Sequence, residues 1–327
     1  MLNLKQIYHA RSRIAPHVTY TPLVPAPSLS NSNREVRLKL ETTQPIGAFK
    51  LRGAINAVSQ LNDNQKQKGV VCASTGNHGR AIAFAATRLG AKATVCMSSL
   101  VPDNKVQAIR ALGADIRIHG NSQDEAQQLV EQLVAEHDMT EIPPFDHADV
   151  VCGQGTIALE LFETWPQVDT ILIGLSGGGL LGGIALAANS INPDVRIIGL
   201  SPQRGAAMAA SLSAGKETEV EELPTLADSL GGGIGTHNRY TFDLVKTYMD
   251  DLILLTEQQI ANAMRHLYYQ EALVSEGAGA VGVAPLIEPA LLDQLKQPLG
   301  RNVAIIVSGK NVDMRDFTSI MRGDIPK

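Results

Sequence analysis

Short apolar runs alternate with helical patterns along most of the chain. Val70–Ala73, Ala93–Met97 and Asp115–His119 are predicted strands, separated by segments whose apolar residues recur at helical spacing. The rhythm resumes after Pro143-Pro144, with further strands predicted at residues 171–175, 195–200 and 303–307. Continuous apolar runs such as the first and last of these are typical of parallel strands covered by helices on both faces. The pattern therefore predicts a doubly wound α/β architecture.

The remaining stretches carry weaker signals. A weak helix opens the chain, Thr21–Pro27 is predicted to be an extended connector, and Arg37–Glu41 alternates like a strand. Ser122 with Glu125 is predicted to form a capping box, and Thr256 with Gln259 is predicted to cap a later helix. Residues 201–240 are predicted to be rich in loops.

Composition and charge exclude several classes of function. The net charge of −5 and the pI of about 5.9 provide no electrostatic footprint for nucleic acid or an anionic membrane. No apolar run approaches the length of a membrane span, and the N-terminal basic residues precede no signal-peptide core. The 3 cysteines lack CxxC spacing and favour a reducing cytoplasm, and the dispersed histidines do not support a catalytic zinc site.

One lysine stands in an unusual setting. Lys50 lies between Phe49 and an apolar helical pattern, and Gly47 and Gly53 flank it. A lysine held against apolar surface loses hydration, which lowers its pKa and makes the amine a usable nucleophile or base. The alternative for this stretch alone is a surface lysine at a helix start.

A glycine-rich loop joins a predicted strand to a predicted helix. It contains Gly177, Gly178 and Gly179, and consecutive glycine amides at a helix N-terminus form a cradle for anions. A bound phosphate is therefore predicted here. The same loop matches the dinucleotide pattern GxGxxG, but no acidic residue ends the next strand; Arg204 there would at best favour NADP. It also matches the hydrolase pattern GxSxG at Ser176, with formal partners in Asp228 and His237 or Asp243 and His266.

Four stretches in this order resemble fold-type II enzymes that use pyridoxal phosphate, and within them the threonine dehydratase and serine racemase group. The stretches are Phe49–Gly53, Ser74–Gly79, Ser176–Leu180 and Ser308–Asn311. The resemblance covers nearly the whole chain.

The resemblance implies the cofactor contacts. Lys50 corresponds to the lysine that forms the Schiff base and later removes the Cα proton, and Asn77 to the residue bonded to the cofactor's 3′-oxygen. Ser308 faces the pyridine nitrogen, where a hydroxyl makes the ring a weaker electron sink than a carboxylate would and favours elimination. The other implied cofactor contacts are Phe49, Ser176, Gly177, Gly178, Gly179, Leu180 and Glu276.

It also implies the substrate contacts. The loop before the helix at residue 77 is expected to hold the substrate carboxylate through backbone amides. Thr75 corresponds to a second catalytic base in racemases; its hydroxyl leaves racemisation possible but sterically harder, so elimination is favoured. His78 is assigned a structural rather than an acid–base role. The implied substrate contacts are Ser74, Thr75, Gly76, His78, Ser229 and Gly231, with Arg239 also shaping the pocket.

Several residues differ from the family pattern, and these differences change what is expected for metal binding, regulation and the branch of the family. Ser201 stands where a cation-binding glutamate precedes the proline, and Ala207 stands near a second expected carboxylate, so no divalent metal site is predicted. No C-terminal regulatory domain, and hence no feedback control by isoleucine, is expected. The glycine-rich Leu226–Gly235 stretch, with the Gln44–Ala48 lead-in, most resembles the dehydratase branch of ectoine and hydroxyectoine utilisation.

The resemblance therefore implies two doubly wound α/β domains with parallel sheets, similar to the tryptophan synthase β subunit, with the cofactor in the cleft between them. A large cofactor-binding domain of residues 1–49 and 148–327 and a small inserted α/β domain of residues 50–147 are expected. The implied reaction is β-elimination from a small β-hydroxy amino acid by a cytoplasmic homodimer, giving a keto acid and ammonia. The alternatives are a racemase of the same fold, a serine hydrolase at Ser176, and a non-catalytic phosphate-binding protein.

Overall fold

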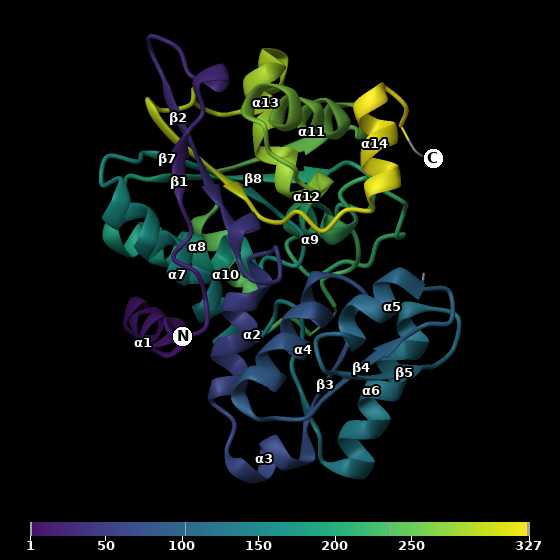
Figure 1. Cartoon of the computed structure of the whole chain (residues 1–327). Helices are drawn as coiled ribbons and strands as arrows, with labels where there is room; N and C mark the ends of the chain where they lie inside the picture. Colours follow the sequence, from purple (N-terminus) through teal and green to yellow (C-terminus); the bar gives the residue numbers. More distant parts are fainter. Residues whose placement is uncertain (1, 102, 236, 326–327) are drawn as a thin grey trace.

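The computed structural model describes residues 2–101, 103–235 and 237–325. Within these residues the chain forms two sheets with helices on both faces, one sheet in each lobe of the molecule (Figure 1). The strands of the smaller sheet all come from the chain between β2 and β7 of the larger one. The predicted α/β fold is confirmed.

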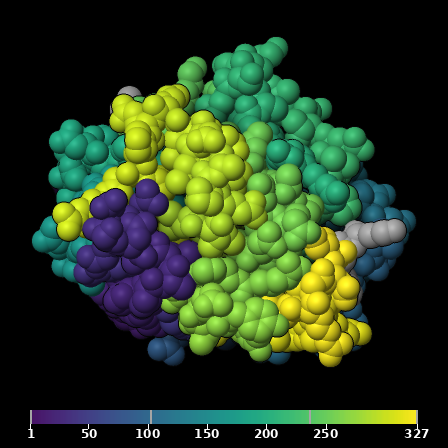
Figure 2. All heavy atoms as spheres, turned by 90° about the horizontal axis from the view of Figure 1, so that it is seen from above, coloured from purple at the N-terminus to yellow at the C-terminus, as the bar shows by residue number. Residues whose placement is uncertain are grey.

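The larger sheet has 6 strands in the order β1-β2-β10-β7-β8-β9. Its strands are β1 (Leu23–Pro25), β2 (Glu35–Leu40), β7 (Thr170–Gly174), β8 (Arg196–Pro202), β9 (Asp251–Leu255) and β10 (Asn302–Val307). All pairs are parallel except the edge pair, in which β1 runs antiparallel to β2. The pairing of β2 with β10 brings the N-terminal segment beside the C-terminal part of the chain, as Figure 2 shows on the upper face.

Alternate side chains of this sheet enter two separate cores. Ile171 and Ile173 of β7 pack into one core, with α1 (Leu4–Ile14), α7 (Ala148–Thr164), α8 (Gly179–Ile191) and α10 (Thr241–Tyr248). Leu172 packs into the other, with α11 (Glu257–Glu271), α12 (Gly277–Ala280), α13 (Ala284–Ile287) and α14 (Met314–Arg322). The two-residue side-chain period of a strand and burial on both faces explain why the run is apolar throughout.

The smaller sheet is built in the same way from 4 parallel strands in the order β5-β4-β3-β6. The strands are β3 (Val70–Ala73), β4 (Ala93–Met97), β5 (Asp115–Ile118) and β6 (Thr140–Glu141). Val70 and Cys72 pack toward α2 (Lys50–Ser59), α4 (Asn77–Leu89) and α5 (Asp103–Arg110). Val71 and Ala73 pack toward α6 (Gln123–His137). The short helix α3 (Asp63–Lys68) precedes β3.

Helix α2 links the two lobes because it packs on both α4 and α7. The contact with α7 is close: a Cβ on Gly53 would lie 2.9 Å from the Val150 carbonyl oxygen, and one on Gly153 would lie 2.6 Å from the Arg52 carbonyl oxygen. Glycine at both positions lets the two helix backbones approach. Lys50 is the first residue of this helix.

Residues 201–240 are rich in loops, as predicted, although they also contain α9 (Ala207–Ala214), and the extended connector at residues 21–27 contains strand β1. The structure corrects one local prediction. Ser122 caps α6, but Glu125 accepts a hydrogen bond from the Asn121 amide instead of completing the predicted capping box. The capping box of Thr256 and Gln259 is confirmed. In the described part of the chain, no helix is both long and apolar enough to cross a membrane.

Candidate active site

The predicted site residues come together around one cavity of about 600 Å³. Lys50 reaches it from the start of α2, and the other walls come from the segments that follow β3, β7 and β10. The carboxyl ends of parallel strands are the usual place for ligand sites in such folds. The predicted residues that line the cavity are Phe49, Lys50, Ser74, Thr75, Gly76, Asn77, His78, Ser176, Gly177, Gly178, Gly179, Leu180, Ser229, Gly231 and Ser308.

Two of the predicted site residues do not line the cavity. Glu276 lies just behind the cavity wall, where it accepts hydrogen bonds from Asn77 at 2.8 Å and from Ser229 at 3.4 Å. Arg239 is not part of the cavity lining, and its backbone N–H donates to Asp146 at 2.6 Å. The cavity lining thus gives no support to the prediction that Arg239 shapes the pocket, and the segment is held in place through its backbone.

Lys50 is half-buried and its amine has few polar partners. Its Nζ donates to the Pro144 carbonyl oxygen at 2.5 Å and lies 5.3 Å from the centroid of the Phe49 ring. Burial lowers the pKa of Lys50 to about 8, although attraction to the Glu276 carboxylate opposes the shift. An amine with such a pKa is partly neutral near physiological pH and can act as a nucleophile or base.

His78 is held as a structural residue. It is buried, and its Nε2–H donates to the Ile142 carbonyl oxygen at 2.7 Å. Burial first, and then the nearby charge of Lys50, lower the pKa of His78 to about 3. The ring therefore stays neutral near physiological pH, and it is a poor proton donor.

Two helix N-termini are directed at the cavity. Gly178 caps α8 with φ of +84°, Gly76 caps α4, and neither helix start is capped by a side chain. Their first backbone N–H groups are thus available to anions, and the helix dipoles add to the attraction. Such an arrangement can hold two separate anionic groups, one at each helix.

The glycines of the loop before α8 are required by close packing. A Cβ on Gly177 would lie 2.4 Å from the Phe145 ring, and one on Gly179 would lie 3.0 Å from the Cα and Cβ atoms of Phe145. Gly178 has left-handed backbone geometry that other residues adopt at a cost. These constraints keep the loop backbone exposed to the cavity.

Ser308 ends the central strand β10 beside the lysine helix. Its backbone oxygen accepts from the Phe49 N–H at 2.9 Å, and Ala48 forms a β-bridge with Gly309. The Ser308 side chain lines the cavity and is 4% exposed. This pairing fixes the start of α2 to the end of the larger sheet.

Several lining residues escaped the sequence analysis. Pro144 and Phe145 lie in the segment that follows β6, and their only sequence signal is the double proline that marks an extended stretch. Gln123 and Glu222 also line the cavity without a recognisable motif, and Asp228, considered above only as a formal partner of Ser176, lines it as well. Among the described residues, no group of three or more His, Cys, Asp and Glu side chains is placed to bind a metal ion.

Comparison with known proteins shows the family. Residues 14–309 match the family described as "Pyridoxal-phosphate dependent enzyme". A putative threonine dehydratase of Sinorhizobium fredii is 49% identical over 323 residues, covering 98% of this chain and 96% of the relative. The L-threonine ammonia-lyase of Thermotoga maritima is 37% identical over 328 residues, covering 100% of this chain and 80% of the relative.

Solved structures show the same fold. Maize serine racemase superposes with a TM-score of 0.90 at 34% identity, covering 98% of this chain and 97% of that chain. The processed form of threonine deaminase isoform 2 from Solanum lycopersicum superposes with a TM-score of 0.87 at 31% identity, covering 97% and 93%.

The cavity fits pyridoxal phosphate. The uncapped N-terminus of α8 provides backbone donors for the phosphate, and the Gly177–Gly179 loop leaves no side chain in the way. The Lys50 amine can bond to the aldehyde carbon, and Ser308 provides a neutral hydroxyl within the same cavity. The donors in the cavity wall thus match the cofactor's groups in kind.

Proposed function

Because the chain belongs to the family of pyridoxal-phosphate-dependent enzymes, we propose that it is a lyase that removes the hydroxyl and amino groups of a small β-hydroxy amino acid. The products are a keto acid and ammonia; L-threonine would give 2-oxobutanoate and ammonia. Curated relatives named as threonine dehydratases and ammonia-lyases support this reaction. The observation that carries it is the half-buried Lys50 amine, with its lowered pKa, in a cavity that two helix N-termini also face.

Each part of the cavity has a task in this proposal. When bound through Lys50, pyridoxal phosphate supplies an electron sink for charge that develops at the substrate Cα. The backbone amides that begin α4 hold the substrate carboxylate and orient the Cα–H bond. Lys50, neutral in part near its pKa of about 8, accepts the Cα proton. His78 remains neutral and holds the loop at residues 74–78 to the Ile142 carbonyl.

Absorbance before and after borohydride reduction, followed by peptide mapping, tests the central claim. A yellow protein whose cofactor becomes fixed to Lys50 is the expected result, and Lys50→Ala should lower turnover roughly 10³-fold or more, because it removes both the attachment and the base. Lys310→Ala is the matched control, since this exposed lysine follows β10 outside the cavity lining. A Lys50→Ala protein with full activity, or a protein that stays colourless with added pyridoxal phosphate, contradicts the proposal.

A racemase of the same fold is the second candidate. Thr75 lines the cavity with a hydroxyl, and maize serine racemase shares the fold at 34% identity. Chiral analysis of the products separates the two reactions, since a racemase accumulates the D-amino acid and a lyase accumulates the keto acid. Elimination is favoured because the threonine methyl crowds the position from which a second base would act.

A serine hydrolase has less support. The Ser176 Oγ donates to the Gly231 carbonyl oxygen at 3.4 Å, and no histidine in the described part of the chain is hydrogen-bonded to it. His266, one of its formal partners, instead contacts Ser28 at 2.6 Å. Labelling with an active-site phosphonate, compared between wild type and Ser176→Ala, tests this alternative directly.

The finer part of the proposal concerns the substrate. Ser229 and Gly231–Gly233, within the glycine-rich segment that resembles the ectoine and hydroxyectoine dehydratase branch, line the cavity. We infer that a hydroxyamino acid derived from hydroxyectoine is the substrate. Comparing kcat/KM for that compound, L-threonine and L-serine tests the inference, and equal or lower values for the first compound contradict it.

A cytoplasmic homodimer completes the proposal. All 3 cysteines are free and buried, as suits a reducing compartment. Light scattering of the purified protein measures the mass, and a monomeric mass contradicts the dimer.

A further inference from the structure

Asn311 lies at the centre of a hydrogen-bond group behind the cavity wall. Its Nδ2 donates to the Asn77 Oδ1 at 2.6 Å and to the Ile46 carbonyl oxygen at 2.8 Å. Its Oδ1 accepts from the Arg80 guanidinium at 2.8 Å, and its backbone N–H donates to the Glu276 Oε2 at 3.0 Å. The Asn311 side chain thus contacts α4 and the segment before α2, while its backbone contacts Glu276 behind the cavity.

The chemistry of these partners allows one orientation of the Asn311 amide. The Ile46 carbonyl can only accept a hydrogen bond, and the Arg80 guanidinium can only donate. The Nδ2 of Asn311 must therefore face Ile46 and Asn77, and its Oδ1 must face Arg80.

The same logic then fixes Asn77. Because Asn311 donates to it, the atom of Asn77 that faces Asn311 is its carbonyl oxygen, and its Nδ2 faces the Glu276 carboxyl group at 2.8 Å. The hydrogen bonds run in one direction, from Arg80 through Asn311 and Asn77 to Glu276. Asn77 is 6% exposed and Glu276 is 5% exposed, so water has little access with which to repair a reversed amide.

We propose that Asn311 and Arg80 are positioning residues that hold the Asn77 amide with its N–H groups toward Glu276 and the cavity. Asn77 has two N–H groups and lines the cavity; one N–H bonds to Glu276, and the other is directed to an acceptor oxygen on the bound cofactor. This inference rests on the proposed function, since it concerns the same cavity and cofactor.

The surrounding backbone supports a positioning role. The Lys310 N–H donates to the Gly47 carbonyl oxygen at 3.0 Å, next to the bridge between Ala48 and Gly309. Gly47 has φ of +76°, and a Cβ there would lie 3.0 Å from the Asn311 Oδ1. The chain before Lys50 is thus shaped to leave room for this amide. Asn77 and Arg80 are three residues apart on α4 and so lie on one helix face. Both of them contact the Asn311 side-chain amide.

Asn311→Asp reverses the polarity of the group with little change in size. The new carboxylate still accepts from Arg80, with added charge attraction, but it cannot donate to Asn77. Asn77 can then donate a hydrogen bond to this carboxylate only by turning its NH₂ group away from Glu276 and the cavity. Asn311→Ala removes the contact without reversing it, so a positioning role predicts that the aspartate variant is the more impaired of the two.

The test uses the holoenzyme and three readouts: the dissociation constant of pyridoxal phosphate, the visible spectrum of the bound cofactor, and kcat with KM for L-threonine. Asn311→Asp should weaken cofactor binding roughly 10- to 100-fold, the range expected when a buried polar group loses its partner. It should also shift the spectrum and lower kcat at saturating cofactor, with KM changed less than about threefold, because the substrate carboxylate is held elsewhere. Asn311→Ala should weaken cofactor binding roughly 3- to 10-fold.

Asn104→Ala is the matched control, because Asn104 also bridges to the segment after β10, through Asp313 at 3.2 Å, but is exposed. It should leave all three readouts unchanged. A wild-type spectrum and affinity in Asn311→Asp, or a larger loss in Asn311→Ala, overturns the inference.

If Asn311→Asp does not fold, the dissociation constant of pyridoxal phosphate is measured for Asn311→Ala and Arg80→Met instead. An unchanged dissociation constant in both variants overturns the inference. Failure of the proposed function is distinguishable, since the wild-type protein would then lack the cofactor bond to Lys50 or the release of keto acid.

Discussion

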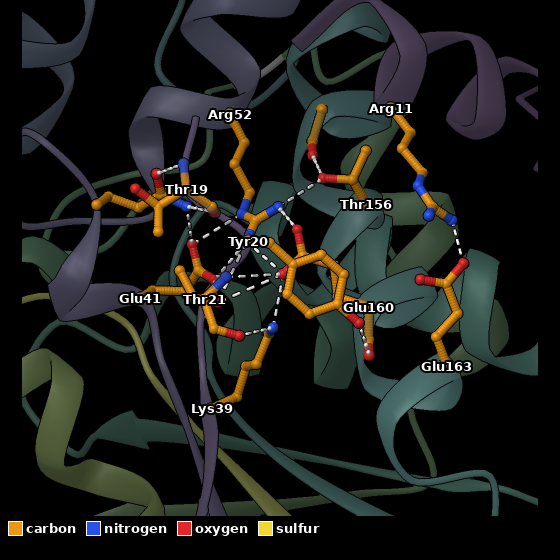
Figure 3. Close-up of polar contacts among 12 residues, drawn as sticks. Arg11, Thr19, Tyr20, Thr21, Lys39, Glu41, Arg52, Thr156, Glu160 and Glu163 are labelled. Carbon is orange, nitrogen blue, oxygen red and sulfur yellow. Dashed lines mark hydrogen bonds and ion pairs between the residues drawn. The ribbon is translucent and has the colours of Figure 1, made fainter. Parts of the chain in front are cut away.

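Helix α2 carries two cations, the half-buried Lys50 and the fully buried Arg52, and their polar surroundings differ. Arg52 is fully buried and donates to Glu41 at 2.8 Å and to Glu160 at 2.6 Å, with further hydrogen bonds to Thr21 and Thr156 (Figure 3). Lys50 has one hydrogen-bond acceptor among the described residues, the Pro144 carbonyl oxygen.

The Arg52 cluster is balanced in charge. Lys39 joins it with 2.6 Å contacts to Glu160 and to the Thr21 carbonyl oxygen, so two cations meet two carboxylates (Figure 3). Burial opposes ionisation of Arg52, but Glu41 and Glu160 outweigh it and keep the pKa of Arg52 above its usual value. Burial likewise opposes ionisation of Glu41, yet Arg52 holds the pKa of that carboxyl group below its usual value. Arg52 and Glu41 therefore stay ionised at an ordinary pH, whereas burial outweighs the attraction of Glu160 and lowers the pKa of Lys39.

The difference teaches how one helix serves two purposes. Where partners satisfy a buried charge, as at Arg52, the charge ties α2 to Glu41, just after β2, and to Glu160 of α7, and fixes the helix in place. Where partners are few, as at Lys50, burial moves the pKa toward neutrality and makes the group reactive. The structural cluster therefore holds the reactive residue two positions away.

Glu160→Gln should produce the largest effect on stability. It leaves Arg52 and Lys39 buried with Glu41 as the one remaining carboxylate in the cluster, and breaking such a buried pair costs about 3–5 kcal/mol. Urea unfolding followed by circular dichroism measures the loss. A change below about 1 kcal/mol would show that the cluster does not hold α2, and would break the comparison.

The second largest effect is expected in the pH dependence of the free energy of unfolding. It tests the buried Glu276 carboxyl group, whose charge acts on Lys50. Burial, reinforced by Asp228, raises the pKa of Glu276 from 4.5 to about 7. The folded cofactor-free protein then binds a proton more tightly than the unfolded chain, so this group makes stability fall as pH rises from 4.5 to 7. The shift of about 2.5 units corresponds to about 3 kcal/mol.

Urea midpoints of cofactor-free protein at pH 5 and pH 7 measure this fall, and Glu276→Gln should remove most of it. Lys50 contributes with the opposite slope in a separate window, since its lowered pKa makes stability rise from about pH 8 to 10.5. Equal pH dependence in wild type and Glu276→Gln would contradict the shift.

The smallest effect is expected at the surface. Glu163 lies three residues from Glu160 on α7 and forms an ion pair with Arg11, but the two side chains are 43% and 38% exposed (Figure 3). Exposed pairs are worth about 0–1 kcal/mol, so Glu163→Gln should barely shift the urea midpoint. If Glu163→Gln lowered the free energy of unfolding as much as Glu160→Gln, the loss would come from changing a residue of α7 and not from the burial of the charges.

The residues that line the cavity were easier to predict than the residues that hold them in position. Lys50, Asn77, the Gly177–Gly179 loop and Ser308 stand in recognisable motifs, and all of them line the cavity. Pro144 belongs to no chemical motif, and the Ser308–Asn311 stretch predicted no contact for Asn311. The Arg52 cluster joins residues 104 and 108 positions apart in the sequence, a separation over which no local pattern extends. Long-range hydrogen bonds leave no periodic trace in a single chain.

Taken by itself, the sequence determined what depends on neighbours along the chain. Apolar runs specify the parallel strands, glycines specify the loop before α8, and the setting of Lys50 indicates its chemistry. The tertiary structure alone decided which partners meet each buried group. It separates Arg52 from Lys50, lowers the pKa of His78 to about 3, and sets the direction of the Asn77 amide. The physical reason is that desolvation and hydrogen-bond direction arise from groups brought together by folding, whatever their separation in sequence.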